Sequence, residues 1–345
     1  MRSLLKLRAD SRKYRLIVLV LVLISFSASV ERTVGQASPF DGSRITHVGV
    51  IVRDPAKVAK VYSDVFGVNV AEPVDFKGKI DFPNSFTGDR DAHPRYTFVR
   101  LPGVGIEIMT PIGGASPWRE YLDTYGDGLH HICFSVKDIR QAIAHLQALG
   151  GKHEMGGSPG VGYAYVNFRD QLGFTIELSQ MPASPPVAST SAAPSVAQAH
   201  TALVGTVIEH IGIVVPDVEK AAKLFGAILR VPVPTARTYP GMQFPKGFTG
   251  DKNAHPKIIT FSMNAGVEFV EAQGGKSPWR DYVEKYGPAI HHLGIPGKVS
   301  VPEAVAAFER RGGSVLLAAS SGATTVDLKP EPMAIAIELN APPKK

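Results

Sequence analysis

The chain has 345 residues, a formal net charge of +6 and a single cysteine. That length is long for one hydrophobic core, so it predicts two domains of ordinary size. Residues 1–37 hold seven basic and two acidic side chains, which accounts for five of the six net positive charges. The remaining body is nearly neutral, and this excludes a basic nucleic-acid-binding surface. The lone Cys133 excludes an intrachain disulfide and a thiolate metal cluster.

The N-terminal segment 1–37 combines a basic flank with the apolar run YRLIVLVLVLISFSASV. The run of about 14 residues is shorter than the roughly 20 that cross a bilayer, so it predicts a signal peptide cleaved near Ala28 or after Ala37. An uncleaved single-helix anchor is the alternative. In both cases we expect an exported chain, periplasmic or extracellular, that touches the membrane only through this segment.

A Pro-, Ala- and Ser-rich stretch divides the rest of the chain. Residues 182–205 are poor in large apolar side chains and predict an extended, exposed linker between a first domain at 43–181 and a second at 206–342. The two halves resemble each other, because GGASPWREYLDTYGDGLHHICF returns 161 residues later as GGKSPWRDYVEKYGPAIHHLGI. Repetition on this scale indicates a duplicated domain.

Each half divides again into two units that begin alike. A short β-branched strand opening at histidine leads to an aspartate turn and an apolar-periodic helix that stops at glycine. The fourth unit, HHLGIPGKVSVPEAVAAFERRGG, has Pro296 and Gly297 in place of the aspartate. Later segments such as RYTFVRL, GIEIMT, AYVNFR and FTIELSQ alternate or run apolar like strands. The pattern predicts an α+β fold of four βαβββ modules, paired in two domains.

Histidine and glutamate recur in matching registers within the predicted strands. The first domain has His47, Glu107, His131 and Glu177, and the second has His210, Glu268, His292 and Glu338. A carboxylate inside a sheet is costly to bury unless it is paired or binds a metal. Any one of these residues alone is more simply explained as a hydrogen-bonded or solvated side chain, but the repeated set suits Zn, Ni, Co, Mn or Fe(II). We therefore predict one divalent metal per domain, with coordination positions open to water or substrate.

The first histidine of each pair, His130 and His291, is expected on the opposite face of its strand and is interpreted as structural. Cys133 shares the predicted face of His131. Its counterpart in the second domain is Gly294, so we interpret Cys133 as a packed thiol.

The segment SPWREYLDTYG predicts a short helix with Ser116 as its cap and Pro117 in its first turn. Trp118 on this helix is expected to anchor packing, rather than to form a platform for substrate.

The paired modules, with HVGVIV and HHICFSV opening them and EIMTP and IELSQ closing them, resemble the vicinal oxygen chelate superfamily, also known as the glyoxalase, bleomycin-resistance and extradiol-dioxygenase group. The likeness covers both domains. Within the group, the stretch from EIMTP to HHICFSV is most similar to methylmalonyl-CoA epimerase. The resemblance implies a cupped sheet in each domain and a metal in each quartet that stabilises an enolate or oxyanion of a substrate with two vicinal oxygens.

The chain departs from the epimerase where the catalytic glutamate of that enzyme would fall. The corresponding segments, FPNSFTGDRDAHPRYTF and FPKGFTGDKNAHPKIITF, contain no glutamate. Both keep an aspartate and a histidine, namely Asp89 and His93 in the first domain and Asp251 and His255 in the second. We predict a general base or a substrate contact among them; an Asp turn followed by a histidine before proline explains them equally well.

These observations favour a metal-dependent isomerase or lyase acting on a small molecule such as a 2-oxo acid, a diol or a thioester, although export disfavours a coenzyme A thioester. An Fe(II) extradiol dioxygenase and a binding protein without turnover are the alternatives. A further alternative is that only one domain is active, with the altered turn at Pro296 marking the second as its support. Since four modules in one chain supply the pairing that shorter relatives obtain by dimerising, we expect a monomer, with a homodimer as the alternative.

Overall fold

The computed structural model describes residues 37–157, 162–180, 203, 205–244, 248–296, 300–310, 313–318, 324–327 and 336–340. The expected leader and linker lie almost wholly outside these ranges. Among the helices in the described part, none is long and apolar enough to cross a membrane.

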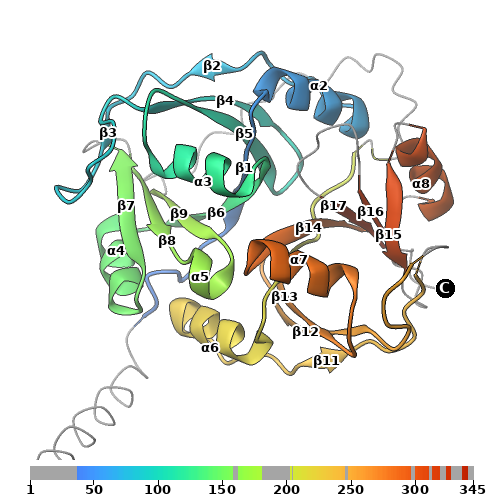
Figure 1. Cartoon of the computed structure of the whole chain (residues 1–345). Helices are drawn as coiled ribbons and strands as arrows, with labels where there is room; N and C mark the ends of the chain where they lie inside the picture. The colour runs from blue at the N-terminus through green and yellow to red at the C-terminus, as the bar shows by residue number, and fades with distance from the viewer. Residues whose placement is uncertain are drawn as a thin grey trace, which may run out of the picture. The chain divides into compact units, whose positions relative to one another are not determined.

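The first domain is built on a nine-stranded mixed sheet (Figure 1). Its strands are β1 (Ile45–Ile51), β2 (Val74–Asp75), β3 (Ile80–Asp81), β4 (His93–Val99), β5 (Gly105–Ile112), β6 (Gly128–Val136), β7 (Lys152–Gly157), β8 (Tyr163–Asn167) and β9 (Thr175–Gln180). Its helices are α2 (Pro55–Phe66), α3 (Pro117–Tyr125), α4 (Ile139–Ala148) and α5 (Arg169–Leu172). The strand order is β2-β4-β5-β1-β6-β9-β8-β7-β3.

The second domain repeats this plan with eight described strands in the order β11-β12-β13-β10-β14-β17-β16-β15. The strands are β10 (His210–Val214), β11 (Arg237–Thr238), β12 (His255–Phe261), β13 (Gly266–Gln273), β14 (Ala289–Ile295), β15 (Ser314–Ala318), β16 (Thr324–Asp327) and β17 (Ala336–Leu339). The helices are α6 (Val218–Leu229), α7 (Pro278–Tyr286) and α8 (Val301–Glu309).

Each domain is a pair of βαβββ modules joined edge to edge by their first strands. In the first domain β1 runs antiparallel to β6 at this junction and parallel to β5, the last strand of its own module. The second domain has the same arrangement of β10 against β14 and β13. The predicted α+β fold of four paired modules is confirmed. The strand β3, which pairs with the far edge at β7, is an addition that the local sequence pattern did not predict.

The helices begin where short-range hydrogen bonding dictates. The side chains of Asp54, Asp138 and Asp217 each accept from backbone N–H groups in the first turn of α2, α4 and α6, which is the role of an N-cap. Helix α2 ends at Gly67, whose φ of 63° is the left-handed conformation that glycine adopts without strain. The histidine-to-aspartate spacing seen in the sequence therefore spans one strand and the cap of the helix that follows.

The alternation of strand residues separates two faces of each sheet. Val48 and Val50 on β1 belong to the main apolar core, together with the side chains of α2 and α4. Ile51 on the other face belongs to a separate cluster with Trp118 and Tyr165. The histidines and glutamates of the quartets lie on this second face. The main apolar core on the first face stabilises the sheet, and the second face carries the candidate site.

Candidate metal centre

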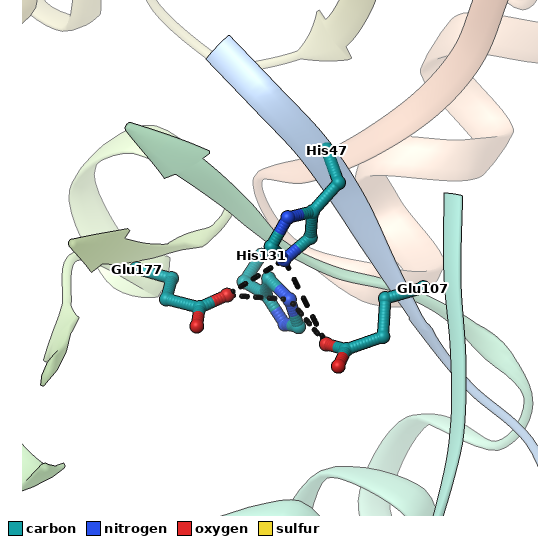
Figure 2. A group of neighbouring side chains, drawn as sticks. All are labelled: His47, Glu107, His131 and Glu177. Carbon is teal, nitrogen blue, oxygen red and sulfur yellow. Dashed lines mark hydrogen bonds and ion pairs between the residues drawn. The ribbon is translucent and has the colours of Figure 1, made fainter. Parts of the chain in front are cut away.

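Four side chains from the four central strands of the first domain meet at one place. Figure 2 shows His47 from β1, Glu107 from β5, His131 from β6 and Glu177 from β9 turned toward a common point. One potential ligand atom from each lies within 4.8 Å of all the others. The prediction that these four residues come together is met by the geometry; that they bind a metal stays a prediction.

The closest approaches all involve imidazole Nε2 atoms and carboxylate Oε2 atoms. His47 Nε2 lies 2.9 Å from Glu177 Oε2 and 3.7 Å from Glu107 Oε2. His131 Nε2 lies 3.2 Å from Glu177 Oε2 and 3.3 Å from Glu107 Oε2. Both imidazoles therefore present the same nitrogen to the same pair of oxygens.

Two atoms in this cluster are buried without a hydrogen bond of acceptable geometry, Glu107 Oε2 and His131 Nε2. A buried polar atom left unsatisfied is costly, so a native site of this kind calls for a missing partner. A divalent cation fits that place, because it accepts nitrogen and oxygen ligands and its charge balances the two carboxylates. The residues present thus fit the metal that the sequence resemblance implies.

The same proximity shifts proton affinities. Burial by itself lowers the pKa of His131, but the adjacent carboxylates of Glu107 and Glu177 outweigh it and raise this pKa to about 9. Burial by itself raises the pKa of Glu177, but His47 and His131 hold it well below its usual range. Without a cation, the positive charge of protonated His131 partly balances the negative charges of Glu107 and Glu177.

The expectation that His130 lies on the opposite face from His131 is wrong. On β1, Gly49 pairs with His131 but the next residue, Val50, pairs with Leu129, so His130 is the extra residue of a β-bulge. The bulge turns both imidazoles to one side, with 3.1 Å between their Nδ1 atoms. His291 occupies the same bulge beside His292, also with an Nδ1 separation of 3.1 Å.

This contact between the two Nδ1 atoms allows His130 to orient His131. Burial keeps the pKa of His130 well below its ordinary value, so the ring is neutral and one of its nitrogens can accept a hydrogen bond. If Nε2 of His131 is to bind a cation, its proton must reside on Nδ1, which faces His130. The pair is the kind of outer contact that fixes the tautomer and orientation of a metal-binding histidine.

A glycine makes room for each second histidine. Gly49 lies beside His131, and a β-carbon at position 49 would overlap the imidazole ring. Gly212 stands in the same relation to His292 in the second domain. The glycine in the motifs HVGV and HIGI is the signal in the sequence for this close approach.

The second quartet converges less. His210, His292 and Glu338 offer ligand atoms within 4.8 Å of one another, while Glu268 falls outside that group. Glu268 Oε1 is 3.9 Å from His292 Nε2, and its other oxygen lies 3.4 Å from the Thr260 hydroxyl. Three of the four predicted ligands converge here, and that they bind a metal stays a prediction.

The imidazoles of the second site face each other instead of the carboxylates. His210 Nε2 is 3.2 Å from His292 Nε2, and Glu338 lies 3.7 Å and 3.6 Å from these two nitrogens. Burial raises the pKa values of Glu268 and Glu338 to about 7 and lowers that of His292. Protons are therefore distributed differently in the two sites.

The other candidate residues lie away from the quartets. Asp89 accepts hydrogen bonds from the backbone N–H groups of Gly114 (2.6 Å) and Asp91 (2.9 Å), and these bonds lower its pKa. His93 Nδ1 lies 2.9 Å from the Asp91 carbonyl oxygen at the start of β4. This matches the turn that we gave as the alternative to a general base.

Their counterparts in the second domain form the same turn. Asp251 accepts from the N–H group of Asn253 (2.8 Å), and His255 Nδ1 lies 2.9 Å from the Asn253 carbonyl oxygen. Strand pairing also argues against a catalytic task, because His93 is five residues from Phe98, the residue that pairs with Glu107, and so faces the other side of the sheet.

Two packing predictions agree with the structure. Cys133 is fully buried, and burial raises the pKa of its thiol well above the ordinary value, so it is a packed and protonated side chain. Ser116 caps α3 by accepting from Arg119 N–H, with Pro117 in the first turn, and Trp118 is only 1% exposed.

A groove of about 460 Å³ lies near the second face but does not contain the quartet. Its lining includes Phe86, the first turn of α3 at Ser116, and Lys152 and Glu154 on β7. Phe86 stacks on Phe82, with 4.2 Å between ring centroids. The charges in this groove are of both signs, and none of the four converging ligands is part of its lining.

Known proteins resemble this chain in sequence. The family model of the Glyoxalase/Bleomycin resistance protein/Dioxygenase superfamily matches residues 46–168 and 209–327. The ethylmalonyl-CoA/methylmalonyl-CoA epimerase of Cereibacter sphaeroides is 28% identical over 144 residues, covering 40% of this chain and 98% of the epimerase. The mitochondrial methylmalonyl-CoA epimerase of Bos taurus is 29% identical over 122 residues, covering 35% of this chain and 62% of that protein.

A solved structure extends the likeness over both domains. A triple mutant of 4-hydroxymandelate synthase from Streptomyces coelicolor superposes with a TM-score of 0.55 at 13% identity, covering 87% of this chain and 93% of that one. At this identity the likeness concerns the fold alone. With a family model matched in each half, and with paired βαβββ modules in both, the chain belongs to the Glyoxalase/Bleomycin resistance protein/Dioxygenase superfamily.

Proposed function

We propose that the first domain binds one divalent metal through His47, Glu107, His131 and Glu177, and that the chain is an isomerase or lyase acting on a small substrate with two neighbouring oxygens. The observation that carries this proposal is the convergence of four ligand atoms within 4.8 Å, two of them buried and otherwise unsatisfied. When bound, the metal supplies Lewis-acid stabilisation of an oxyanion formed beside the reacting carbon.

The protein contributes position and a defined charge. The two carboxylates and two imidazoles come from four adjacent strands, so backbone hydrogen bonds hold their spacing without help from a loop. Each glutamate presents Oε2 to the cluster, which leaves its second oxygen to meet substrate or move a proton. Residues 82–98 contain no glutamate, so we assign proton transfer to Glu107 and Glu177.

The substrate we propose is a small oxygenated acid, not a coenzyme A thioester. The two epimerases described above are named for coenzyme A thioesters, but the basic and apolar leader favours export, where such cofactors are scarce. We propose that residues 1–37 are a signal peptide or a membrane anchor.

A second candidate function rests on the second domain. His210, His292 and Glu338 form a set of two histidines and one carboxylate, which is the ligand set of non-haem Fe(II) oxygenases. If this site selects iron, ring-cleaving or related O₂ chemistry becomes the better description of that domain.

The test is the metal content per chain of protein purified without added metal, compared with His131→Ala and His292→Ala variants. Two equivalents, with one lost in each variant, support two working sites, and iron confined to the second site favours the oxygenase. One equivalent lost only in His131→Ala supports an active first domain alone.

No tightly bound metal, with both variants unchanged, would refute the proposal and leave a binding protein without turnover. Ligand binding after treatment with a chelator separates these cases further, since a metal-independent binder keeps its affinity.

A further inference from the structure

Five aromatic rings form a continuous series around the ligands of the first domain. They are Phe98, Tyr96, Phe76, Tyr163 and Tyr165, in spatial order, and we refer to them as the aromatic ring set. Neighbouring members have centroid separations of 5.8, 6.3, 6.0 and 6.1 Å. These are contact distances for aromatic pairs in edge or tilted geometry.

Both ends of the series touch the metal-binding histidines. The Phe98 ring lies 5.4 Å from the His47 ring, and the Tyr165 ring lies 5.2 Å from the His131 ring, both in edge-on geometry. Strand pairing explains this placement, because Phe98 pairs with Glu107 and Tyr165 pairs with Glu177, so each aromatic residue shares a face with a ligand.

Of the aromatic ring set, only Tyr165 belongs to the buried cluster that contains Ile51 and Trp118, and Tyr96 and Tyr163 pack against that cluster. Phe76, Tyr96, Phe98 and Tyr163 are only partly buried, in contrast to the fully buried aromatic residues on the helical side of the sheet. The hydroxyls of Tyr96 and Tyr163 have no hydrogen-bond partner within the described part of the chain. Burial, followed by the nearby Glu177 and Glu107, raises the pKa of Tyr163, so its hydroxyl stays protonated and available as a donor.

The second domain shows that the fold does not require these rings. At the position that pairs with its own glutamate, Thr260 replaces Phe98 and Thr325 replaces Tyr165. Ile258 replaces Tyr96 two residues earlier on β12. In the second domain the modules still pair and three of the four ligands still converge. The aromatic side chains of the first domain are therefore not needed for the fold or for the convergence of ligands.

We infer that the first domain takes a substrate that carries an aromatic ring beside its two metal-binding oxygens. This inference rests on the proposed function, since the metal is what holds the oxygens. Partly exposed aromatic edges next to the ligands offer a flat organic ring the same edge and face contacts that they make with one another. The Tyr163 hydroxyl provides a donor for an oxygen of the same molecule.

The test uses two hydroxy acids that chelate in the same way and differ by one phenyl group, 3-phenyllactate and lactate. Binding is measured by calorimetry on the metal-loaded His292→Ala chain, so that only the first site is present, and the metal content is determined on the same sample. We expect 3-phenyllactate to bind about tenfold or more tightly than lactate.

The variant Tyr96→Ile/Phe98→Thr installs the residues of the second domain. It is expected to bring the two affinities within about twofold of each other while retaining one metal per chain. Thr260→Phe is the matched control, because it makes the reverse exchange in the other domain and should leave the tenfold preference intact. Should the double variant fold poorly, Phe98→Leu keeps an apolar side chain and is expected to lose part of the preference.

The outcomes separate the two claims. Equal binding of the two acids with one metal bound overturns the aromatic assignment and leaves the proposed function standing. A preference that survives in the double variant also overturns it, since the rings would then not be its source. If no metal binds, the proposed function fails, and the aromatic inference fails with it.

Discussion

The two domains hold the same four residue types in the same strand registers, yet their side chains converge to different degrees. In the first domain both imidazoles point Nε2 at carboxylate oxygens, and all four ligands gather. In the second domain the imidazoles point at each other, and Glu268 stays outside the group. Ligand identity is therefore not what distinguishes the sites.

The difference can be traced to the residue that pairs with the first histidine. Gly294 pairs with His210, and the imidazole lies where a β-carbon at position 294 would be. Cys133 pairs with His47 and fills that space with its own side chain, so the ring turns toward Glu177. We therefore expect this one neighbouring side chain to decide whether the histidine faces a carboxylate or another histidine.

The largest effect on the difference between the two sites is expected from filling the space beside His131 or its counterpart His292. Gly49→Ala forces the His131 ring to move, so we expect loss of the first metal equivalent, or an affinity lower by about 100-fold or more. Gly212→Ala should do the same to the second site only. Elemental analysis of each variant checks this.

Gly105→Ala serves as the control. A β-carbon at position 105 would lie near the β-carbon of His47 but would not meet the imidazole ring of His47 or of His131. A Gly49→Ala protein that keeps its full metal content and affinity would contradict the placement of His131 at the metal.

The fold was largely predictable because its signals are local. The spacing from each strand histidine to Asp54, Asp138 or Asp217 encodes a strand and a helix cap within a few residues. The pairing of β3 with β7 was not predictable in this way, since it joins residues more than 70 positions apart through a two-residue strand.

The site was predictable in its residue types but not in its geometry. The bulge at His130 breaks the period of two on which the opposite-face expectation depended. His47 and His210 pair with Cys133 and Gly294, which are distant from them in sequence, so this difference between the two sites is not visible near either histidine. The aromatic ring set comes from two strands and a loop that are far apart in the sequence, so no single sequence window displays it.

A second test removes the contact behind the metal. His130→Phe fills the bulge but cannot accept a hydrogen bond from His131 Nδ1, so we expect a metal affinity of the first site that is about 10-fold to 100-fold weaker. His291→Phe should weaken the second site in the same manner. Competition with a chelator gives both affinities.

His153→Phe provides the control, since His153 lines the groove outside the quartet and should leave both affinities unchanged. Unchanged affinity in His130→Phe would mean that the 3.1 Å contact has no part in orienting the ligand.

The third test sharpens the comparison by exchanging the neighbours. Gly294→Ala places a β-carbon under the His210 ring, which should turn it toward Glu338 and raise the metal affinity of the second site by up to about tenfold. Cys133→Gly should lower the affinity of the first site by a similar factor. The measurements use His131→Ala and His292→Ala backgrounds so that one site is read at a time.

If Gly294→Ala weakens the second site instead, the facing imidazoles of His210 and His292 are the productive arrangement. The two domains would then be built for different metals, not for one metal with different strengths.

The smallest expected effect is a pH dependence of stability in the metal-free protein. His131 has a pKa raised from 6.5 to about 9 in the folded state. Its contribution to stability is therefore complete below about pH 6.5 and is lost as the pH rises through 9. In the second domain the pKa values of Glu268 and Glu338 are raised from 4.5 to about 7 in the folded state. Their contribution to stability is therefore lost as the pH rises from 4.5 to 7, and it changes little above pH 7.

The lowered pKa of His292 opposes this loss below pH 6.5, so the two domains are best compared between pH 7 and 9. Trp279→Phe and Trp118→Phe leave one tryptophan as the reporter of each domain, and thermal unfolding is followed by its fluorescence. We expect the melting temperature seen by Trp118 to fall on the order of 5 °C over this range and that seen by Trp279 to stay level. Saturating metal should remove this pH dependence of the melting temperature, because the cation replaces the proton between Glu107 and Glu177. Identical pH profiles at both tryptophans would show that the carboxylates of the first site do not hold a proton on His131.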